Sequence, residues 1–305
     1  RFLREPHEKP FLLWASFDQP HDICSFVARK EDELAKAPSV PLPDNAAPTQ
    51  GEGFWMRGFR DGTLGDEDSI ELGLNRRYGL AVQDWTEEQW RRYRGWYRRS
   101  MERADRQIGV VLDALQEAGL DDSTVVLFTS DHGDHDGAHG LAMKRSFYEE
   151  SVHVPLILRH PAQPWCGSVD TRHLVSNGLD LVPTLCDGAG IDVPPGLPGR
   201  SLLPAVLGRD SGNGRSYVVS ETVGGRMVRT ERYKYCLYVH DGRADEYLFD
   251  LEDDPGEKVN LAARVAERSV VACHRRLLSD WVQEQHDERG RTYLAALSRA
   301  RTHER

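Results

Sequence analysis

The sequence lacks any long apolar run. The longest two, Thr124–Phe128 and Val152–Leu158, have the length of a strand, far below the ~18–20 residues that a membrane-spanning helix needs. We therefore expect no membrane segment. The composition, 39% hydrophobic and 29% charged residues, is that of a globular protein, which excludes a disordered chain, a collagen or a coiled coil. A length of 305 residues predicts one large domain, or one large and one small domain.

Cysteine, lysine and net positive charge are also scarce. The five cysteines are scattered and never occur in C-x-x-C spacing, so we expect neither a disulfide framework nor a structural zinc site. The net charge of −10 argues against nucleic acid as a partner, because phosphate binding needs a basic surface. The chain has six lysines against 33 arginines, so a lysine inside a motif can mark a place that needs a compact point charge.

The first half of the chain predicts a strand, a loop region and a long helix. The apolar segment Pro10–Phe17 predicts a strand buried on both faces, as in a parallel sheet. Residues 35–80, rich in Pro, Gly, Asp and Asn, predict long surface loops with short helices that wall a site. Residues 84–119 predict a helix in which Thr86 and Gln89 form a capping box. Gly119 is expected to end it.

The remaining segments predict an α/β layered sheet followed by a smaller lobe. Strands at 124–129 and 154–158 and a helix at 179–189 continue an alternating order of strands and helices. After residue 213, closely spaced strands predict an antiparallel sheet, at residues 217–220, 227–230, 233–239 and 247–251. A helix over 262–285 is expected to pack on this sheet through Val265, Leu278 and Trp281. The expected domains are residues 1–212 and 213–305.

Residues 131–140, Asp-His-Gly-Asp-His-Asp-Gly-Ala-His-Gly, concentrate metal-ligating and acid–base side chains where a predicted strand ends. In open α/β sheets ligands bind at that end of the strands, and Asp131 and His132 can both reach one cation if the turn points them the same way. The alternative is a polar surface loop with incidental histidines. Lys144 and His21 are the other candidates, although each taken alone is as readily a solvated or loop side chain.

Three segments of this region together resemble the second metal-binding motif of the sulfatase family, which belongs to the alkaline-phosphatase superfamily. The segments are Ser130–Asp134, Gly137–Lys144 and Tyr148–Ile157. Further family-like segments follow the expected order between Phe11 and about Ala263, at residues 16–21, 105–109, 180–185, 199–202, 229–235 and 248–261. The resemblance implies an alkaline-phosphatase-like layered α/β sheet with helices on both faces, plus a small C-terminal α+β lobe with an antiparallel sheet.

The resemblance also implies roles for individual residues. Asp131 and His132 would bind a divalent cation, His21 would protonate the leaving alcohol, and Lys144 would neutralise a sulfate oxygen. These roles suit the charge that gathers on the bridging oxygen as the S–O bond breaks. Calcium is the expected ion, with manganese or zinc as alternatives because an imidazole favours softer ions. The expected partner is a small sulfated substrate, and the substrate-binding candidates are His135 and His139.

The resemblance breaks at the nucleophile. The family makes a formylglycine from Cys or Ser in a C/S-x-P/A-x-R signature, and none of the five cysteines lies in one. We therefore expect the C-terminal portion of a sulfatase or a naturally truncated relative, holding half of the active site and inactive alone. The alternatives are a phosphonate or phosphate ester hydrolase of the same superfamily and a non-catalytic relative that binds sulfated glycans. The sequence leaves open the natural ester, the oligomeric state and the compartment, bacterial cytoplasm or periplasm.

Overall fold

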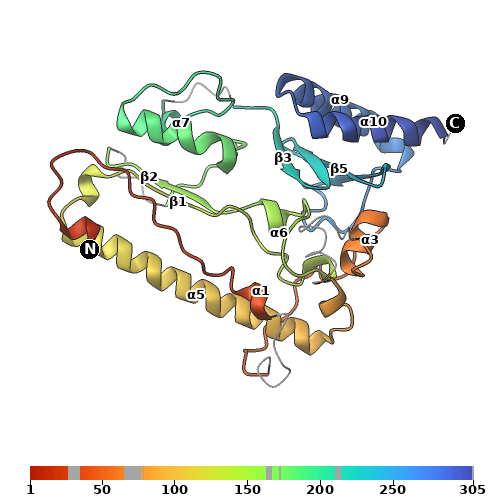
Figure 1. Cartoon of the computed structure of the whole chain (residues 1–305), viewed down its shortest axis with the longest axis horizontal. Coiled ribbons are helices and arrows are strands. Elements are labelled where there is room, and N and C mark those ends of the chain that lie inside the picture. The colour runs from red at the N-terminus through yellow and green to blue at the C-terminus, as the bar shows by residue number, and fades with distance from the viewer. Residues whose placement is uncertain are drawn as a thin grey trace.

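The structure is a computed structural model that describes residues 1–26, 35–64, 77, 79–162, 167–171, 173–209 and 214–303. Figure 1 shows two regions side by side. In one, helices α5 (Glu87–Glu117) and α7 (Asn177–Ala189) lie on opposite sides of strands β1 (Val126–Thr129) and β2 (Leu156–Arg159). In the other, two C-terminal helices cover a four-stranded sheet. Among the described helices, none is both long and apolar enough to cross a bilayer.

Helix α5 forms as its sequence predicts. Thr86 is the N-cap, its side chain accepts from the Gln89 amide, and the Gln89 side chain accepts from the Thr86 amide. Trp85 and Trp90 pack together at the entrance, with ring centroids 4.9 Å apart, which is the hydrophobic staple expected before a capped helix. The helix ends at Glu117, and Gly119 follows with a φ of 66°. The predicted helix is therefore confirmed.

Strands β1 and β2 pair antiparallel, with Val126 opposite Arg159 and Thr129 opposite Leu156. An alternating order of strands and helices is typical of parallel sheets, but here the chain between the two strands passes through helix α6 (Glu149–Val152) and returns in the opposite direction. Helix α7 begins at Asn177, two residues before the predicted start, and ends at Ala189 with Gly190 as its C-cap.

The strand predicted over residues 10–17 is wrong. This segment has no regular secondary structure, and Leu12 and Trp14 are 71% and 72% exposed. A strand needs a partner for its backbone hydrogen bonds, and none of the strands in the described part of the chain pairs with this segment. Its apolar composition alone therefore did not produce a strand.

The C-terminal sheet is an antiparallel meander, as predicted. Its strands are β3 (Val218–Thr222), β4 (Gly225–Arg229), β5 (Tyr233–His240) and β6 (Arg243–Asp250). Both faces are buried: Cys236 and Tyr238 of β5 join one hydrophobic core, whereas Tyr235 and Leu237 join another that contains helices α9 (Arg268–Glu284) and α10 (Glu288–His303). Alternate residues of a strand point to opposite faces. Because both faces are buried, nearly every residue of β5 is apolar.

The predicted C-terminal helix packs differently at its start. Leu278 is 1% exposed as expected, but Val265 is 70% exposed, because it lies in a separate 3-10 turn, η4 (Val265–Glu267), before α9 begins. The other buried residues of α9 are Val271, His274 and Val282. The second helix, α10, was not predicted; it packs on the sheet through Tyr293 and Leu297.

Residues 35–80 do more than form surface loops. Helix α3 (Phe54–Arg60) lies in this segment and places Trp55, Met56 and Phe59 in the same core as Cys236 and Tyr238. This core therefore crosses the expected domain boundary at residue 212, which stays a prediction. Residues 65–76 and 78 lie outside the described residues. The other short helices are η1 (Phe2–Arg4), α1 (Ile23–Phe26), η2 (Asp121–Ser123), η3 (Ala138–Gly140) and α8 (Leu203–Val206).

Candidate active site

The candidate site lies on the loop that leaves β1. The segment after it is anchored on two sides, because Ala142 and Met143 join a core under α5, whereas Leu141, Phe147 and Tyr148 join the core around α3. The loop start is fixed by Gly133, whose amide donates to the Ser151 carbonyl at 2.8 Å. A Cβ atom at residue 133 would lie 2.0 Å from the Glu150 carbonyl oxygen, so only glycine permits this approach.

Asp131 and His132 present two ligand atoms together. His132 Nε2 and Asp131 Oδ2 are 3.4 Å apart, and ligand atoms bound about 2.1–2.4 Å from one ion have separations of this size. His132 Nδ1 lies 2.9 Å from the Gly133 carbonyl, which can only accept, so Nδ1 carries the proton and Nε2 keeps its lone pair. Imidazoles that bind metals usually donate their other N–H in this way. The pair therefore fits a divalent cation.

The charges of Lys144 and His21 act on His132. Burial lowers the pKa of His132, the charges of Lys144 and His21 lower it further, and the Gly133 carbonyl and Asp131 oppose the shift. Cys24 Sγ lies 3.8 Å from His21 Nδ1. Burial raises the pKa of Cys24, and the charge of Lys144 opposes part of this increase. The charge of Lys144 therefore contributes to the pKa of both His132 and Cys24.

Strained backbone on both sides of Lys144 fixes where its side chain begins. Met143 and Arg145 have φ angles of 70° and 87°, in the left-handed region that side chains other than glycine rarely adopt. Such conformations persist only where surrounding packing enforces them, and they cluster at functional sites. Lys144 itself is half-buried and, within the described residues, has no ion pair with a carboxylate.

Sequence reasoning missed the buried groups that hold this loop. The Tyr93 hydroxyl of α5 donates to Asp134 Oδ1 at 2.8 Å and accepts from the Met143 amide at 3.2 Å. It therefore links the segment after His132 to the residue before Lys144. Burial raises the pKa of Asp134 to about 7. The only sequence signal for this contact was the place of Tyr93 in the apolar stripe of the helix.

His135 and His139 are both completely buried. His135 contacts Ser146 Oγ at 2.6 Å and the Ala142 carbonyl at 3.3 Å. His139 stacks on the Tyr148 ring, with centroids 3.6 Å apart. Burial lowers their pKa values to about 4 and about 3, so both imidazoles are neutral near pH 7. Their burial gives no support to the predicted contact with substrate, which stays a prediction.

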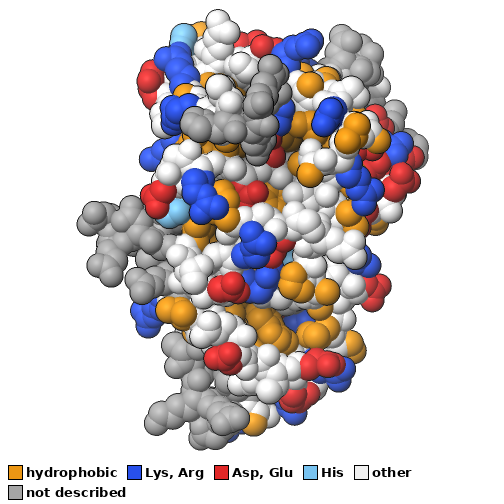
Figure 2. All heavy atoms as spheres, turned by 90° about the vertical axis from the view of Figure 1, so that its right-hand side faces the viewer, with side chains coloured by type: hydrophobic (Ala, Val, Ile, Leu, Met, Phe, Trp, Pro, Cys, Tyr) orange, Lys and Arg blue, Asp and Glu red, His pale blue; other side chains and the backbone are white. Residues whose placement is uncertain are grey.

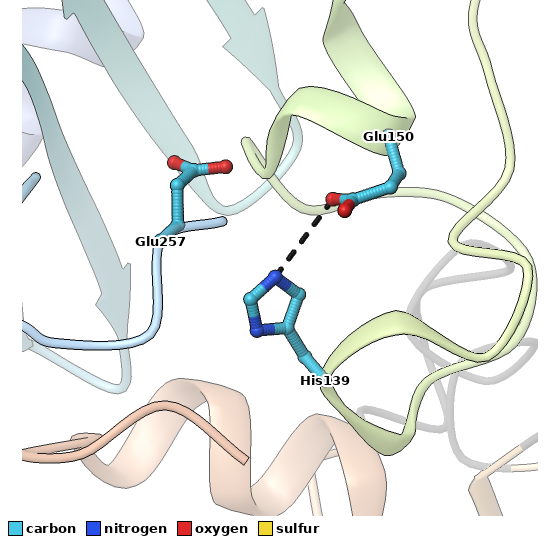
Figure 3. A group of neighbouring side chains, drawn as sticks. All are labelled: His139, Glu150 and Glu257. Atoms are coloured by element: carbon cyan, nitrogen blue, oxygen red, sulfur yellow. Dashed lines mark ion pairs between the residues drawn. The ribbon is translucent and has the colours of Figure 1, made fainter. Parts of the chain in front are cut away.

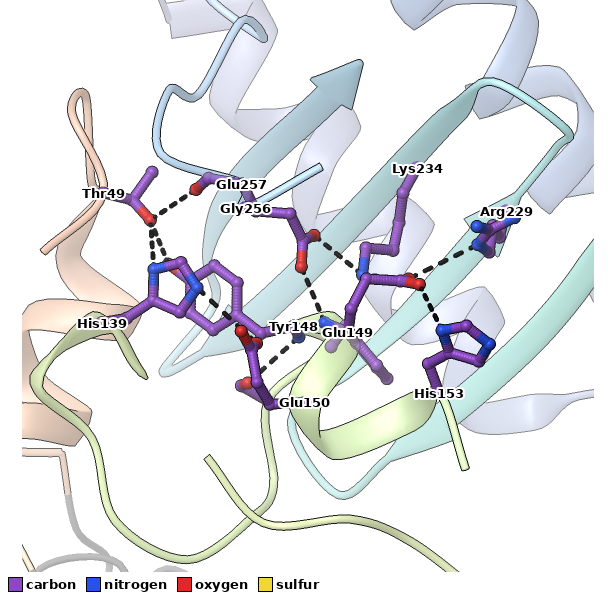
Figure 4. Close-up of polar contacts among 12 residues, drawn as sticks. Thr49, His139, Tyr148, Glu149, Glu150, His153, Arg229, Lys234, Gly256 and Glu257 are labelled. Atoms are coloured by element: carbon purple, nitrogen blue, oxygen red, sulfur yellow. Dashed lines mark hydrogen bonds and ion pairs between the residues drawn. The ribbon is translucent and has the colours of Figure 1, made fainter. Parts of the chain in front are cut away.

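A second group of buried charges, also missed, lies where α6 meets the C-terminal sheet (Figure 4). Lys234 Nζ is 2.8 Å from both Glu149 Oε1 and Glu257 Oε1. The three residues are completely or largely buried. Opposite charges at this distance offset the cost of removing each group from water. The sequence signal was a lysine inside the apolar run of β5, flanked in sequence by Tyr233 and Tyr235.

Comparisons with known proteins agree with these motifs. Residues 1–191 match the family described as Sulfatase, and residues 137–284 match N-sulphoglucosamine sulphohydrolase, C-terminal. The Delta 4,5-hexuronate-2-O-sulfatase of Bacteroides thetaiotaomicron is 33% identical, over 99% of this chain and 63% of that protein. A solved 2-O GAG sulfatase is 32% identical with a TM-score of 0.74, covering 88% of this chain and 58% of the other.

A phosphonate monoester hydrolase of Agrobacterium radiobacter is also similar. Its solved structure is 29% identical with a TM-score of 0.58, covering 67% of this chain and 44% of the other. The chain thus spans 63% or less of the length of each of these three relatives. The family match nevertheless covers well over half of the 305 residues and includes the whole candidate loop. This chain is a member of the sulfatase family.

Proposed function

We propose that this chain supplies the metal-binding and leaving-group half of a sulfatase active site, which hydrolyses a sulfate ester to an alcohol and sulfate. The observation that carries the proposal is the joint placement of Asp131 and His132, with Nε2 and Oδ2 3.4 Å apart, within electrostatic reach of Lys144 and His21. An acidic ligand, a neutral imidazole, an ammonium group and a second imidazole make a binding place for a cation and an anion together.

Each residue has a chemical task in this reaction. Asp131 and His132 would hold the divalent cation, which when bound supplies positive charge beside the sulfate oxygens. Lys144 would place its ammonium group against a sulfate oxygen, where negative charge grows as the S–O bond breaks. His21 would donate a proton to the bridging oxygen, so that the product leaves as a neutral alcohol.

The nucleophile would come from residues outside this sequence. None of its five cysteines lies in the family's C/S-x-P/A-x-R signature, so the chain alone should not turn over. The choice of substrate follows the relatives, of which one is named a hexuronate-2-O-sulfatase and one a 2-O GAG sulfatase. A 2-O-sulfated uronic acid sugar is therefore the substrate class that we propose for the complete protein.

A Lys144→Ala variant tests the role of the ammonium group. In the complete protein that contains this sequence, kcat/KM for a 2-O-sulfated uronide should fall about 100-fold or more, because a fixed charge at the growing oxyanion is lost. Lys36→Ala, which removes an exposed lysine, should leave kcat/KM unchanged. Equal rates for Lys144→Ala and the wild-type protein would contradict the assignment.

The second candidate is phosphonate or phosphate ester hydrolysis, which the similarity to the phosphonate monoester hydrolase favours. The two reactions differ in the reacting centre, sulfur or phosphorus, but can share cation, lysine and histidine. The complete protein should therefore be assayed with aryl sulfate and aryl phosphonate esters side by side. A kcat/KM at least tenfold higher for the phosphonate would replace our proposal with this one.

A further inference from the structure

One carboxylate oxygen of Glu150, next to the candidate loop, is buried although the side chain as a whole is 28% exposed. Glu150 Oε1 accepts from Asn45 Nδ2 at 2.7 Å, but the buried Oε2 has no hydrogen-bond partner among the described residues. Within the described part of the chain, the only basic side chain within ion-pair distance of Glu150 is His139, at 3.8 Å. Leaving a carboxylate oxygen buried and unpaired is costly.

The imidazole of His139 is completely buried and lies between two polar side chains. Its Nε2 faces the Asn45 amide nitrogen at 3.3 Å. The Asn45 amide group has two hydrogens: Glu150 Oε1 accepts one at 2.7 Å, and the other is within reach of both His139 Nε2 and the Gly256 carbonyl at 3.2 Å. In the tautomer in which His139 Nε2 accepts this hydrogen, Nδ1 carries the proton toward Thr49 Oγ1 at 3.2 Å. A lone pair of His139 Nε2 then lies 3.8 Å from Glu150 Oε2.

Glu257 completes the group from a third part of the chain. It is 1% exposed, and one of its carboxylate oxygens, a ring nitrogen of His139 and an oxygen of Glu150 all lie within 4.8 Å of one another. Figure 3 shows His139 and Glu150 pointing at each other, with the Glu257 carboxylate beside them. Lys234 Nζ and the Glu149 amide contact Glu257 from the other side. Glu257 Oε1 forms an ion pair with Lys234 Nζ at 2.8 Å but accepts no hydrogen bond within the part of the chain that the structure describes.

We propose that His139, Glu150 and Glu257 bind a divalent cation of the zinc or manganese class, at a site separate from Asp131 and His132. Two atoms bound about 2.1 Å from one ion are at most about 4.2 Å apart, so the 3.8 Å between His139 Nε2 and Glu150 Oε2 already fits. Glu257 needs only to approach slightly. One imidazole and two carboxylates suit these softer ions better than calcium.

The ion would join three segments that are distant in sequence. His139 lies in the turn η3 before Lys144, Glu150 in helix α6, and Glu257 in the loop after β6. A cation that binds only the folded arrangement stabilises it by mass action. The proposed role is therefore structural: the ion fixes the candidate loop to the C-terminal sheet. This inference does not rest on the sulfatase assignment, since it uses none of the four residues proposed for hydrolysis.

The test is zinc binding by the whole chain after removal of metals with a chelator. The double variant Asp131→Asn/His132→Ala, which changes the two exposed or half-exposed residues of the other site, should still bind one equivalent of Zn²⁺ in isothermal titration calorimetry. Adding Glu150→Gln, which keeps the side-chain shape, should weaken that binding at least about tenfold. Adding Glu252→Gln at an exposed glutamate should leave the affinity unchanged.

Cobalt gives a second measurement that does not depend on the stability of a variant. Co²⁺ bound to the double variant should produce visible absorption bands of a nitrogen-and-oxygen site, and Zn²⁺ should displace it. If the double variant binds no Zn²⁺ while its circular dichroism spectrum shows a folded chain, the proposal is wrong and a proton shared by His139 and Glu150 is the better explanation. Unchanged zinc affinity in Glu150→Gln would also overturn it.

Discussion

At the scale of single residues, the environment of His135 makes stability depend on pH. The side chain is fully buried and its pKa is lowered to about 4, whereas an unfolded histidine titrates near 6.5. Below pH ~6.5 the unfolded chain therefore takes up a proton that the folded chain refuses. Neutral His135 thus contributes up to about 3 kcal/mol to the free energy of unfolding. This contribution is fully present above pH ~6.5 and is lost as the pH falls toward 4.

A His135→Gln variant should remove this part of the pH dependence. We expect the free energy of unfolding of the wild-type chain to fall more steeply between pH 6.5 and 4 than that of the variant, as measured by urea denaturation at several pH values. His286→Gln, at an exposed histidine, should keep the slope of the wild-type chain. The same slope in His135→Gln would show that another group controls acid stability.

Single residues also show how far the sequence could define the site. Asp131, His132 and Lys144 could be selected because they stand in one local motif after a recognisable strand. Tyr93 could not be paired with Asp134, nor Lys234 with Glu149, because these pairs are 41 and 85 positions apart. Such contacts depend on how distant segments pack, which a local pattern does not contain.

At the scale of elements, helix α5 contains two glycines in opposite surroundings. A Cβ at Gly95 would lie 1.7 Å from the Pro38 carbonyl oxygen, whereas a Cβ at Gly109 would meet nothing within 4 Å. Alanine favours a helix interior over glycine by about 0.8–1.0 kcal/mol. The same substitution should therefore act in opposite directions at the two positions.

We expect Gly109→Ala to raise the free energy of unfolding by about 0.5–1 kcal/mol. Gly95→Ala should lower it by at least about 1–3 kcal/mol, because the loop at Pro38 must move. Thermal denaturation followed by circular dichroism measures both changes. A gain in stability at Gly95 would show that the close contact with Pro38 is not present in solution.

The elements that the sequence predicted well are those with local signals. The capping box of α5 and the alternating faces of β5 both follow from side chains close in sequence. The segment 10–17 resembles a strand equally well, yet it is exposed because pairing depends on a neighbour rather than on its own residues. The direction of β2 likewise depended on the course of the chain through α6.

At the scale of the whole molecule, one hydrophobic core joins the two halves of the sequence. Trp55 is 1% exposed, and its ring stacks on Tyr238, with centroids 5.0 Å apart. A Cβ at Gly224 would overlap the same ring. This shared packing around Trp55 predicts that residues before and after position 212 unfold together. On the surface, acidic and basic side chains are interspersed over the face shown in Figure 2, with apolar groups between them.

Trp55→Ala should lower the stability of both regions at once, by about 3–5 kcal/mol. Circular dichroism and tryptophan fluorescence should report a single transition at the same denaturant concentration, shifted downward in the variant. Trp14→Ala, at a 72% exposed position, is the matched control and should unfold like the wild-type chain. Two separated transitions in the wild-type chain would instead support independent domains at the expected boundary.

The exposed side chain of Trp14 favours self-association of the chain in solution. Leu12 and Ile157 are also exposed, at 71% and 61%. Within the described residues, the nearby strands β1 and β2 form a two-stranded sheet whose outer edges have no further strand beside them. Exposed apolar side chains and unpaired strand edges promote association between copies of the same molecule. Encounters between copies grow with the square of concentration, so dilute, cold storage with a mild surfactant favours a clear solution over a precipitate.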